Sequence, residues 1–140
     1  MKQLLLTAFV LTLFANSYGQ KKLDNTITID TFRTIKDIKQ ILFSKGFTID
    51  GTDTSFFITT PKQMKSAAVL RLMMARTDTS IMIKGQYKLQ VELVLFDTPI
   101  KNDFEPVEYR LSKQNLNYEY FGEMDKIAKL LGNKITYSKQ

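Results

Sequence analysis

The chain contains no histidine and no cysteine. These two residue types supply the nucleophile–base pairs of many hydrolases and the usual protein ligands of zinc and haem. The six glycines stand apart, without the GxGxxG or GxxxxGK spacing of a phosphate-binding loop. The side chains left to do chemistry are therefore carboxylates, lysines, tyrosines, hydroxyls and methionine thioethers.

A carboxylate pair is the simplest catalytic arrangement that this composition allows. Asp103, Glu105 and Glu108 are close enough in sequence to form the acid and base of a glycosidase, which needs one carboxyl with a raised pKa. They lie in a polar stretch, and nothing in the pattern predicts the burial that raises a pKa. Asp50 and Asp53 lack the alternating carboxylates of an EF-hand loop. We therefore expect no catalytic residue, no metal site and no cofactor, and we predict that the protein is not an enzyme.

Four methionines lie within 19 residues of one another: Met64, Met73, Met74 and Met82. Exported proteins use thioethers to bind Cu(I). Methionine also fills irregular space in protein cores, and that is the interpretation we adopt.

Two tyrosines are candidate contacts for a ligand or partner. Tyr118 and Tyr120 precede Phe121 in a predicted helix that also carries Lys126 and Lys129. Together they could stack on a ligand and hold it. The alternative is that the tyrosines rim the start of the helix, each with one end in water, while Phe121 packs inward.

The stretch from residue 67 to residue 96 predicts the centre of a sheet. The run 67–75 is almost continuously apolar, which is typical of a central strand covered by a helix. Residues 76–80 provide a turn, and residues 81–83 begin a second strand. Residues 89–96 continue it, since they alternate with the period of two of a half-buried strand. Gly85 interrupts the second strand, which predicts a bulge or bend.

Three apolar residues are predicted on the sheet face away from the core: Phe57, Val94 and Phe96. An exposed apolar face is typical of a partner surface. The same residues would line a ligand cavity if a further element covered them.

Two amphipathic helices flank the sheet. The first begins with Asp30 or Thr31 as N-cap and ends at Gly46, and the second runs from Asn117 to Gly132. Asp50-Gly51 predicts a hairpin between residues 47–50 and 54–60. Residues 107–111 predict a short strand, and 134–137 could return to the sheet.

The first 19 residues resemble a secretory signal peptide. A basic start is followed by the apolar run Leu4–Ala15, and Ser17 and Gly19 occupy the −3 and −1 positions of a cleavage site that would leave Gln20 first. Cleavage after Ala15 is the alternative. No cysteine forms a lipobox, so we expect a soluble periplasmic or secreted protein without a transmembrane segment.

Residues 20–30 are predicted to be a flexible lead-in, although Ile27 and Ile29 could form a short edge strand, and residues 31–140 are predicted to form a single α+β domain. The net charge is +6, with basic and acidic residues interspersed. Because this balance chiefly favours solubility, we predict no nucleic-acid partner.

The order of helix, hairpin, long strands and helix resembles the helix-grip and TBP-like modules of small exported bacterial proteins, including the BamC-type outer-membrane assembly lipoproteins. The resemblance rests on Asp30–Gly46, on GFTIDGTDTSFFITT and on Asn117–Gly132. It implies a curved antiparallel sheet of about four to six strands with both helices packed on one face. The missing lipobox departs from BamC, so neither an assembly role nor any functional residue is transferred.

The expected function is that of a non-enzymatic binding or protein-interaction module in the cell envelope. The sequence predicts a full set of helices, strands and turns but no group of reactive side chains that would form an active site, and this favours a binding module. The alternative is a carrier of a small apolar ligand or lipid between the sheet and the C-terminal helix. A carboxylate hydrolase ranks third, and buried Asp103 and Glu105 would reverse the order.

Overall fold

The computed structural model describes residues 19–49, 51–91, 94–99 and 102–140. The predicted signal peptide lies outside these residues except for Gly19. The side chain of Val94, one of the predicted surface residues, also lies outside what the structure describes.

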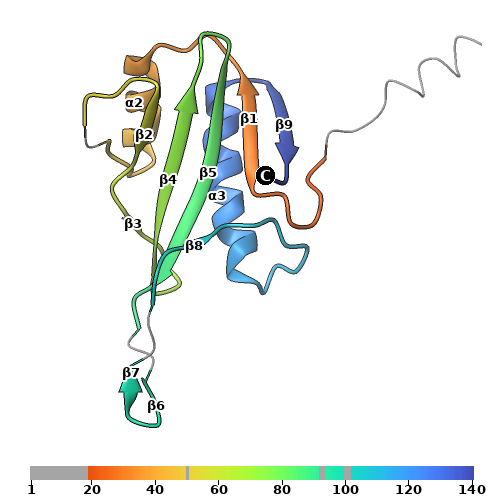
Figure 1. Ribbon diagram of the computed structural model, residues 1–140. Coiled ribbons are helices and arrows are strands. Elements are labelled where there is room, and N and C mark those ends of the chain that lie inside the picture. Colours follow the sequence, from red (N-terminus) through yellow and green to blue (C-terminus); the bar gives the residue numbers. More distant parts are fainter. Residues whose placement is uncertain (1–18, 50, 92–93, 100–101) are drawn as a thin grey trace, which may run out of the picture.

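An open antiparallel sheet carries both helices on one of its faces (Figure 1). Its main strands lie in the order β2-β4-β5-β1-β9, with β3 paired to β4 and β8 paired to β5. The elements are β1 (Thr26–Asp30), α2 (Ile35–Ser44), β2 (Phe56–Ile58), β3 (Lys62–Gln63), β4 (Ala68–Arg76), β5 (Ser80–Leu89), β6 (Val94–Leu95), β7 (Thr98–Pro99), β8 (Glu105–Pro106), α3 (Leu116–Leu131) and β9 (Lys134–Ser138).

The predicted α+β class with an antiparallel sheet is confirmed. The main sheet has seven strands rather than four to six, and the helix-grip order is not confirmed. The additional strands are short pieces of segments that the sequence pattern assigned to loops, chiefly β3 and β8. The pair β6 and β7 forms a separate hairpin, which is drawn beyond the lower end of β5 (Figure 1).

Strand β1 corrects the expectation of a flexible lead-in. Residues 26–30 form an interior strand rather than an edge, because β1 pairs with β5 on one side and with β9 on the other. Ile27 and Ile29 are fully buried. A five-residue strand has too few residues for its alternation to stand out, and its interior position depends on partners more than 50 residues away.

The long pair of β4 and β5 forms the centre of the sheet, as predicted. Nine residue pairs run without interruption from Ala68–Leu89 to Arg76–Ile81. The connecting turn is closed by two hydrogen bonds: Ser80 donates its N–H to the Thr77 hydroxyl at 3.0 Å, and Thr77 donates its N–H to the Ser80 carbonyl at 2.9 Å. This is the turn chemistry expected of threonine and serine.

Gly85 does not form the predicted bulge. It pairs in register with Leu72 in the middle of β5. A Cβ atom at this position would lie 2.6 Å from the Met124 sulfur and 3.0 Å from Cγ2 of Val107. The glycine therefore lets α3 and residue 107 approach the strand closely.

The second long strand, predicted to continue through residues 89–96, is shorter than predicted. β5 ends at Leu89, and Phe96 and Asp97 form the two-residue turn between β6 and β7, both with positive φ (49° and 61°). Turns of this type favour Asn-Gly, because most residues other than glycine, asparagine and aspartate are strained at positive φ.

Both helices begin at other residues than predicted. Thr34 caps α2, because its hydroxyl accepts from the Asp37 N–H at 3.2 Å while the Asp37 carboxylate accepts from the Thr34 N–H. The Thr34 hydroxyl also donates to the Asp37 carboxylate at 2.8 Å, and this bond, followed by the one from the Thr34 N–H, lowers the pKa of Asp37. Phe32 consequently lies outside the helix and is 84% exposed. Gly46 has φ of +81°, as expected just past a helix end.

Helix α3 is capped by Asn115, and Asn117 instead accepts from the Glu108 N–H at 3.0 Å. Its predicted apolar face is confirmed, since all five residues are buried: Phe121, Met124, Ile127, Ala128 and Leu131. Residues 134–138 return to the sheet as β9, in agreement with one of the two expectations.

The predicted first hairpin is present in reduced form. A single antiparallel bridge joins Ile49 to Thr59, while β2 takes its ladder from β4. The short strand predicted at 107–111 lies instead at Glu105–Pro106.

Alternate residues of β1, β4 and β5 face the helices and form the core. From β4 these are Ala68, Leu70, Leu72 and Met74, and from β5 they are Ile81 and Ile83. Tyr120, Phe121 and Phe47 add the largest buried side chains. No helix in the described part of the chain is both long and apolar enough to cross a membrane.

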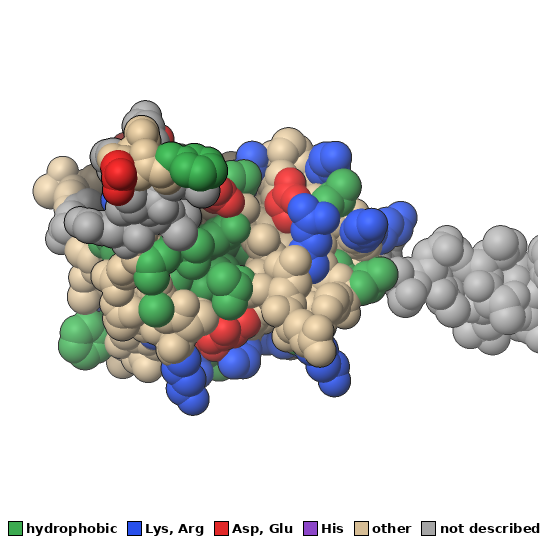
Figure 2. Space-filling model, turned by 90° about the horizontal axis from the view of Figure 1, so that it is seen from below, with side chains coloured by type: hydrophobic (Ala, Val, Ile, Leu, Met, Phe, Trp, Pro, Cys, Tyr) green, Lys and Arg blue, Asp and Glu red, His purple; other side chains and the backbone are tan. Residues whose placement is uncertain are grey.

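Charged residues surround the apolar centre of the molecule rather than forming one patch. Seen from below, hydrophobic side chains gather in the middle and lysine and arginine side chains lie around them (Figure 2). Several acidic residues are paired with nearby lysines, including Asp30 with Lys134 at 2.8 Å and Asp125 with Lys129 at 2.6 Å.

Replacing Gly85 with alanine is expected to lower the free energy of unfolding by about 1–3 kcal/mol, because the new methyl group overpacks the contact with Met124 and Val107. Urea denaturation of both proteins measures this. Gly122→Ala is the matched control, since its Cβ would meet nothing within 4 Å. It should stabilise helix α3 by up to about 1 kcal/mol. Equal effects of the two substitutions would contradict the account of Gly85.

Candidate functional site

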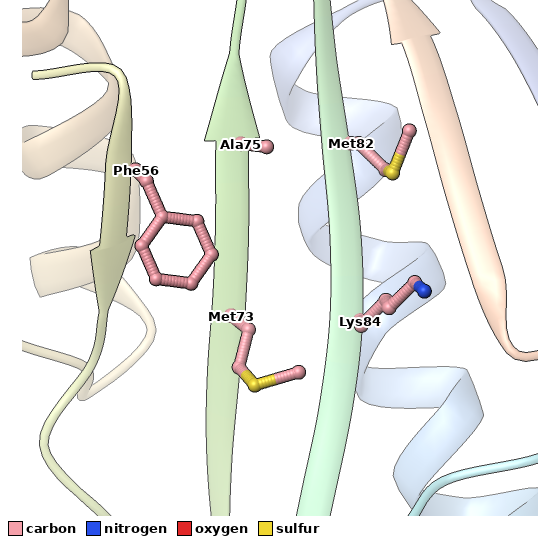
Figure 3. Close-up of a pocket in the computed structure, with 5 residues that line it drawn as sticks. All are labelled: Phe56, Met73, Ala75, Met82 and Lys84. Atoms are coloured by element: carbon pink, nitrogen blue, oxygen red, sulfur yellow. The ribbon is translucent and has the colours of Figure 1, made fainter.

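The sheet face opposite the helices carries an apolar strip. Register places Phe56 beside Ala75 and Met82 in one row, and Ile58 beside Met73 in the next. We call these five residues the open-face strip. Phe56 is 51% exposed and Ile58 37% exposed. A shallow hollow of about 240 Å³ lies between Phe56, Met73, Ala75, Met82 and Lys84 (Figure 3).

Lys84 provides a positive charge at the end of this strip. It follows Met82 on the same face of β5 and pairs in register with Met73 (Figure 3). The structure assigns its ammonium group no hydrogen bond or ion pair among the residues that it describes. Arg71, by contrast, already has partners. Its guanidinium donates to Gln86 at 2.9 Å and lies 3.8 Å from the centre of the Phe104 ring.

The sequence identified the wrong face of β2. Phe57 was predicted on the outer face, but it is buried in the core with 4% exposure. Thr59 lies on the same side of the chain as Phe57, and a polar residue is typical of a side that faces water. Thr59 is also buried, and its hydroxyl accepts from the Leu72 N–H at 2.9 Å. That bond satisfies the polar group inside the protein.

Phe96 is 92% exposed, the largest exposed fraction among the large hydrophobic side chains that the structure describes. It lies at the turn of the β6–β7 hairpin rather than on the main sheet. The structure therefore does not bring Phe96 and Phe57 together into one surface. Val94 lies in β6, with its side chain outside the described atoms.

Tyr120 is not a surface residue, in contrast to the sequence prediction. It is fully buried, its hydroxyl shares a hydrogen bond of 2.7 Å with Ser66, and its ring lies 5.0 Å from that of Tyr87. Burial is the main cause of its raised pKa. The alternative prediction, that Phe121 packs inward, is correct.

Tyr118 lies at a second hollow, which we call the α3 cleft. This cleft of about 350 Å³ is lined by Gln20, Tyr109 and six residues of α3: Tyr118, Phe121, Gly122, Asp125, Lys126 and Lys129. It brings together Tyr118 and the two lysines that the sequence marked as a possible ligand grip. Sequence reasoning missed Tyr109, Gly122 and Asp125, because Tyr109 comes from a distant segment and the other two carry no motif.

A short hydrogen-bond chain supports the cleft. The Tyr137 hydroxyl donates to Oδ1 of Asp125 at 2.6 Å, and Lys129 pairs with Oδ2 at 2.6 Å. Burial, followed by the bond to Asp125 and its negative charge, raises the pKa of Tyr137 to about 12. The carboxylate is thereby held in place between α3 and β9.

Gly122 is unusual in the middle of α3, since glycine costs roughly 1 kcal/mol relative to alanine within a helix. Neither conformation nor packing requires it, because a Cβ here would meet nothing within 4 Å. A side chain at position 122 would instead extend into the cleft that this residue lines.

The carboxylates considered for hydrolysis do not lie in a common cleft. Glu105 accepts from the Tyr87 hydroxyl at 2.9 Å, whereas Glu108 accepts from Arg110 at 2.7 Å. Asp103 and Glu105 are both exposed. Within the described ranges, no three acidic side chains gather closely enough to hold a metal ion.

The remaining sequence candidates have structural roles. Met64 and Met74 are buried in the core, while Met73 and Met82 belong to the open-face strip. Asp53 accepts from the N–H groups of Ser55 and Phe56 and so stabilises the turn before β2. Asp50 lies outside the described residues.

Comparisons with known proteins found no similarity: no family model matches the chain, and no curated protein matches its sequence. The functional argument therefore rests on the open-face strip and the α3 cleft.

The raised pKa of Tyr137 predicts a loss of stability at alkaline pH. The folded protein holds this proton more tightly than the unfolded chain, in which tyrosine titrates near pH 10. Its contribution is complete below about pH 10 and is lost as pH rises toward about 12. Denaturant titrations across this range should show a smaller alkaline loss for Tyr137→Phe than for the wild type. Tyr118→Phe serves as the control, and an unchanged pH profile in Tyr137→Phe would contradict the assignment.

Proposed function

We propose that the protein is a non-enzymatic exported module that binds a protein partner through the open-face strip. The observation that carries the proposal is the strip itself. Five apolar residues on adjacent strands lie together on the face that neither helix covers. Contiguous exposed apolar surface is uncommon on monomers and is typical of interaction sites.

The size of the hollow favours a macromolecular partner over an enclosed ligand. Sites for small molecules occupy roughly 300–1,000 Å³ and bury most of the ligand. The hollow at Phe56 holds about 240 Å³ and is open along one side of the sheet. A protein surface can cover the whole strip, whereas an apolar small molecule would remain largely in water.

A lipid carrier is the second candidate, and the packing between sheet and helix counts against it. The side chains of α3 that face the sheet fill this layer, since Met124 and Ile127 are fully buried and Phe121 is 1% exposed. Contact of Met124 with Gly85 leaves no room even for a methyl group at that point.

The charge of the strip indicates what kind of partner fits it. Lys84 lies at the end of the strip, and the structure gives it no acidic partner among the described residues. A partner that combines apolar side chains with a carboxylate would pair with this ammonium group. Complementary charges of this kind contribute mainly to specificity and to the association rate.

Site-specific photo-crosslinking tests the proposal. A photoreactive phenylalanine analogue at position 56 should form one defined cross-linked product in cells that produce the protein. Phe43 provides a matched control, because it is an exposed phenylalanine (73%) on helix α2. The cross-link should be lost when Met73→Glu is added, since a carboxylate would then occupy the strip. Identical products at positions 43 and 56, or no product at 56, would contradict the proposal.

Export makes a separate prediction about the mature chain. Every helix and strand that the structure describes begins after residue 25, so removal of residues 1–19 would leave all of them intact. The intact mass of the protein from its native host should correspond to a chain that begins at Gln20. A protein that keeps its first 19 residues and is found in the cytoplasmic fraction would contradict export. That result would not affect the argument for the open-face strip.

A further inference from the structure

The outer edge of β9 is the longest strand edge that the described part of the chain leaves unpaired. β9 lies at one end of the sheet and pairs only with β1 (Figure 1). At the other end of the sheet, β2 has three residues, and the adjoining Thr59 forms a bridge with Ile49. An unpaired edge presents N–H and C=O groups on which a further strand can build a ladder.

The register of the sheet shows which neighbour each residue of β1 bonds to. Thr31 donates its N–H to the Thr79 carbonyl at 3.0 Å, which continues the β1–β5 register by one pair beyond Asp30 and Ser80. In an antiparallel ladder, alternate residues form hydrogen-bonded pairs with one neighbour, and the residues between them turn their N–H and C=O groups to the other side. The odd-numbered residues of β1 therefore bond to β5, and the even-numbered ones bond to β9.

The same alternation orients β9. Each even-numbered residue of β1 lies opposite an even-numbered residue of β9, so the N–H and C=O groups of Ile135 and Tyr137 point away from the sheet. Among the described residues, the lead-in forms its bonds to β9 elsewhere. Asn25 donates its N–H to the Ser138 carbonyl at 3.0 Å, and Gln20 bonds to the Tyr137 hydroxyl. The outward backbone groups of the strand are therefore available to a partner strand.

The residue pattern of β9 complements a second copy of itself. A two-fold axis at Thr136 would place Ile135 of one copy opposite Tyr137 of the other, so that both pairs exchange N–H···O bonds. An aromatic side chain opposite a β-branched one is a favourable cross-strand pair. An axis at Ile135 or Tyr137 would instead bring Asn133 or Lys139, which lie outside β9, into the ladder. The axis at Thr136 therefore keeps every pair within the strand.

The charges of β9 are compatible with this arrangement. Lys134 would face Ser138 of the second copy, and it already pairs with Asp30 of its own chain at 2.8 Å. The middle of the strand is the uncharged run Ile135-Thr136-Tyr137. Edges that resist pairing usually carry a charge or proline, whereas β9 has its lysine at the first residue and none in the middle.

We propose that β9 pairs antiparallel with β9 of a second copy of the chain, about a two-fold axis at Thr136, and so joins two main sheets into one. The same surface of both copies forms the contact, as in most symmetric dimers. The contact uses the edge of the sheet and not its open face. It is therefore independent of the proposed function of the open-face strip, and either can fail without the other.

Disulfide cross-linking tests the position of the axis. Opposite residues of a non-hydrogen-bonded antiparallel pair have Cα atoms about 4.5 Å apart, within the roughly 4.4–6.8 Å that a disulfide spans. Because the chain has no cysteine, mild oxidation of the Thr136→Cys protein should give a single disulfide-linked dimer. Ser138→Cys is the matched control on the same face of β9. Its two Cα atoms would lie about 13 Å apart along the strands, and it should remain monomeric.

Sedimentation equilibrium with charged variants tests the contact without a covalent bond. The wild type should associate reversibly to a dimer with a Kd of about 1 mM or tighter. Thr136→Lys and Thr136→Glu should each weaken this association about fivefold, because like charges would meet at the axis. An equimolar mixture of the two variants should associate at least as tightly as the wild type. Thr54→Lys, an exposed position before the opposite edge strand β2, should leave association unchanged.

Several results would overturn the proposal. These are a wild type that remains monomeric up to about 1 mM, equal cross-linking at positions 136 and 138, or a mixture of charged variants that associates no better than each variant alone. Association that is lost in Met73→Glu but kept in Thr136→Lys would place the contact on the open-face strip and would also overturn the pairing of β9. If a charged variant fails to fold, the comparison of Thr136→Cys with Ser138→Cys decides.

Discussion

The uninterrupted pairing of β4 with β5 is the constraint on which the rest of the structure depends. Nine consecutive residue pairs fix the alternation of both strands, so one set of side chains faces the helices and the other faces away. Because Gly85 lacks a side chain, Met124 of α3 can rest directly against the middle of this pair. The contact sets how closely α3 approaches the sheet, and because both helices lie on this face, the opposite face has no cover.

The two candidate sites follow from this division of the sheet. On the uncovered face, the outward residues of β2, β4 and β5 meet in the open-face strip, and Lys84 adds a charge at its end. On the covered side, the part of α3 that points away from the core forms a cleft with Tyr109, supported by the bond between Tyr137 and Asp125. The hollow of the strip is lined almost wholly by apolar atoms, whereas the α3 cleft is mixed in polarity.

Two residues depart from the usual local preferences of core strands and helices. Thr59 is a polar residue in the core, where its hydroxyl accepts from the N–H of Leu72 in the middle of β4. Gly122 is a glycine inside a helix, where it leaves a cleft unfilled. For Thr59 the local preference is overridden by a buried hydrogen bond, whereas nothing in the packing requires glycine at position 122.

The sequence alone determined the elements whose signals repeat over many residues. The apolar face of α3, the central strand pair and the α+β class could all be predicted, because 3.6-residue and two-residue periods report directly which side of an element is buried. Short segments were beyond this reasoning. β1 has five residues and β2 three, too few to reveal their inward face, and both acquire it only from partners distant in the chain. Only the tertiary structure decided that Phe56 rather than Phe57 faces outward and that Tyr109 meets Tyr118, since both depend on strand register and packing between distant segments.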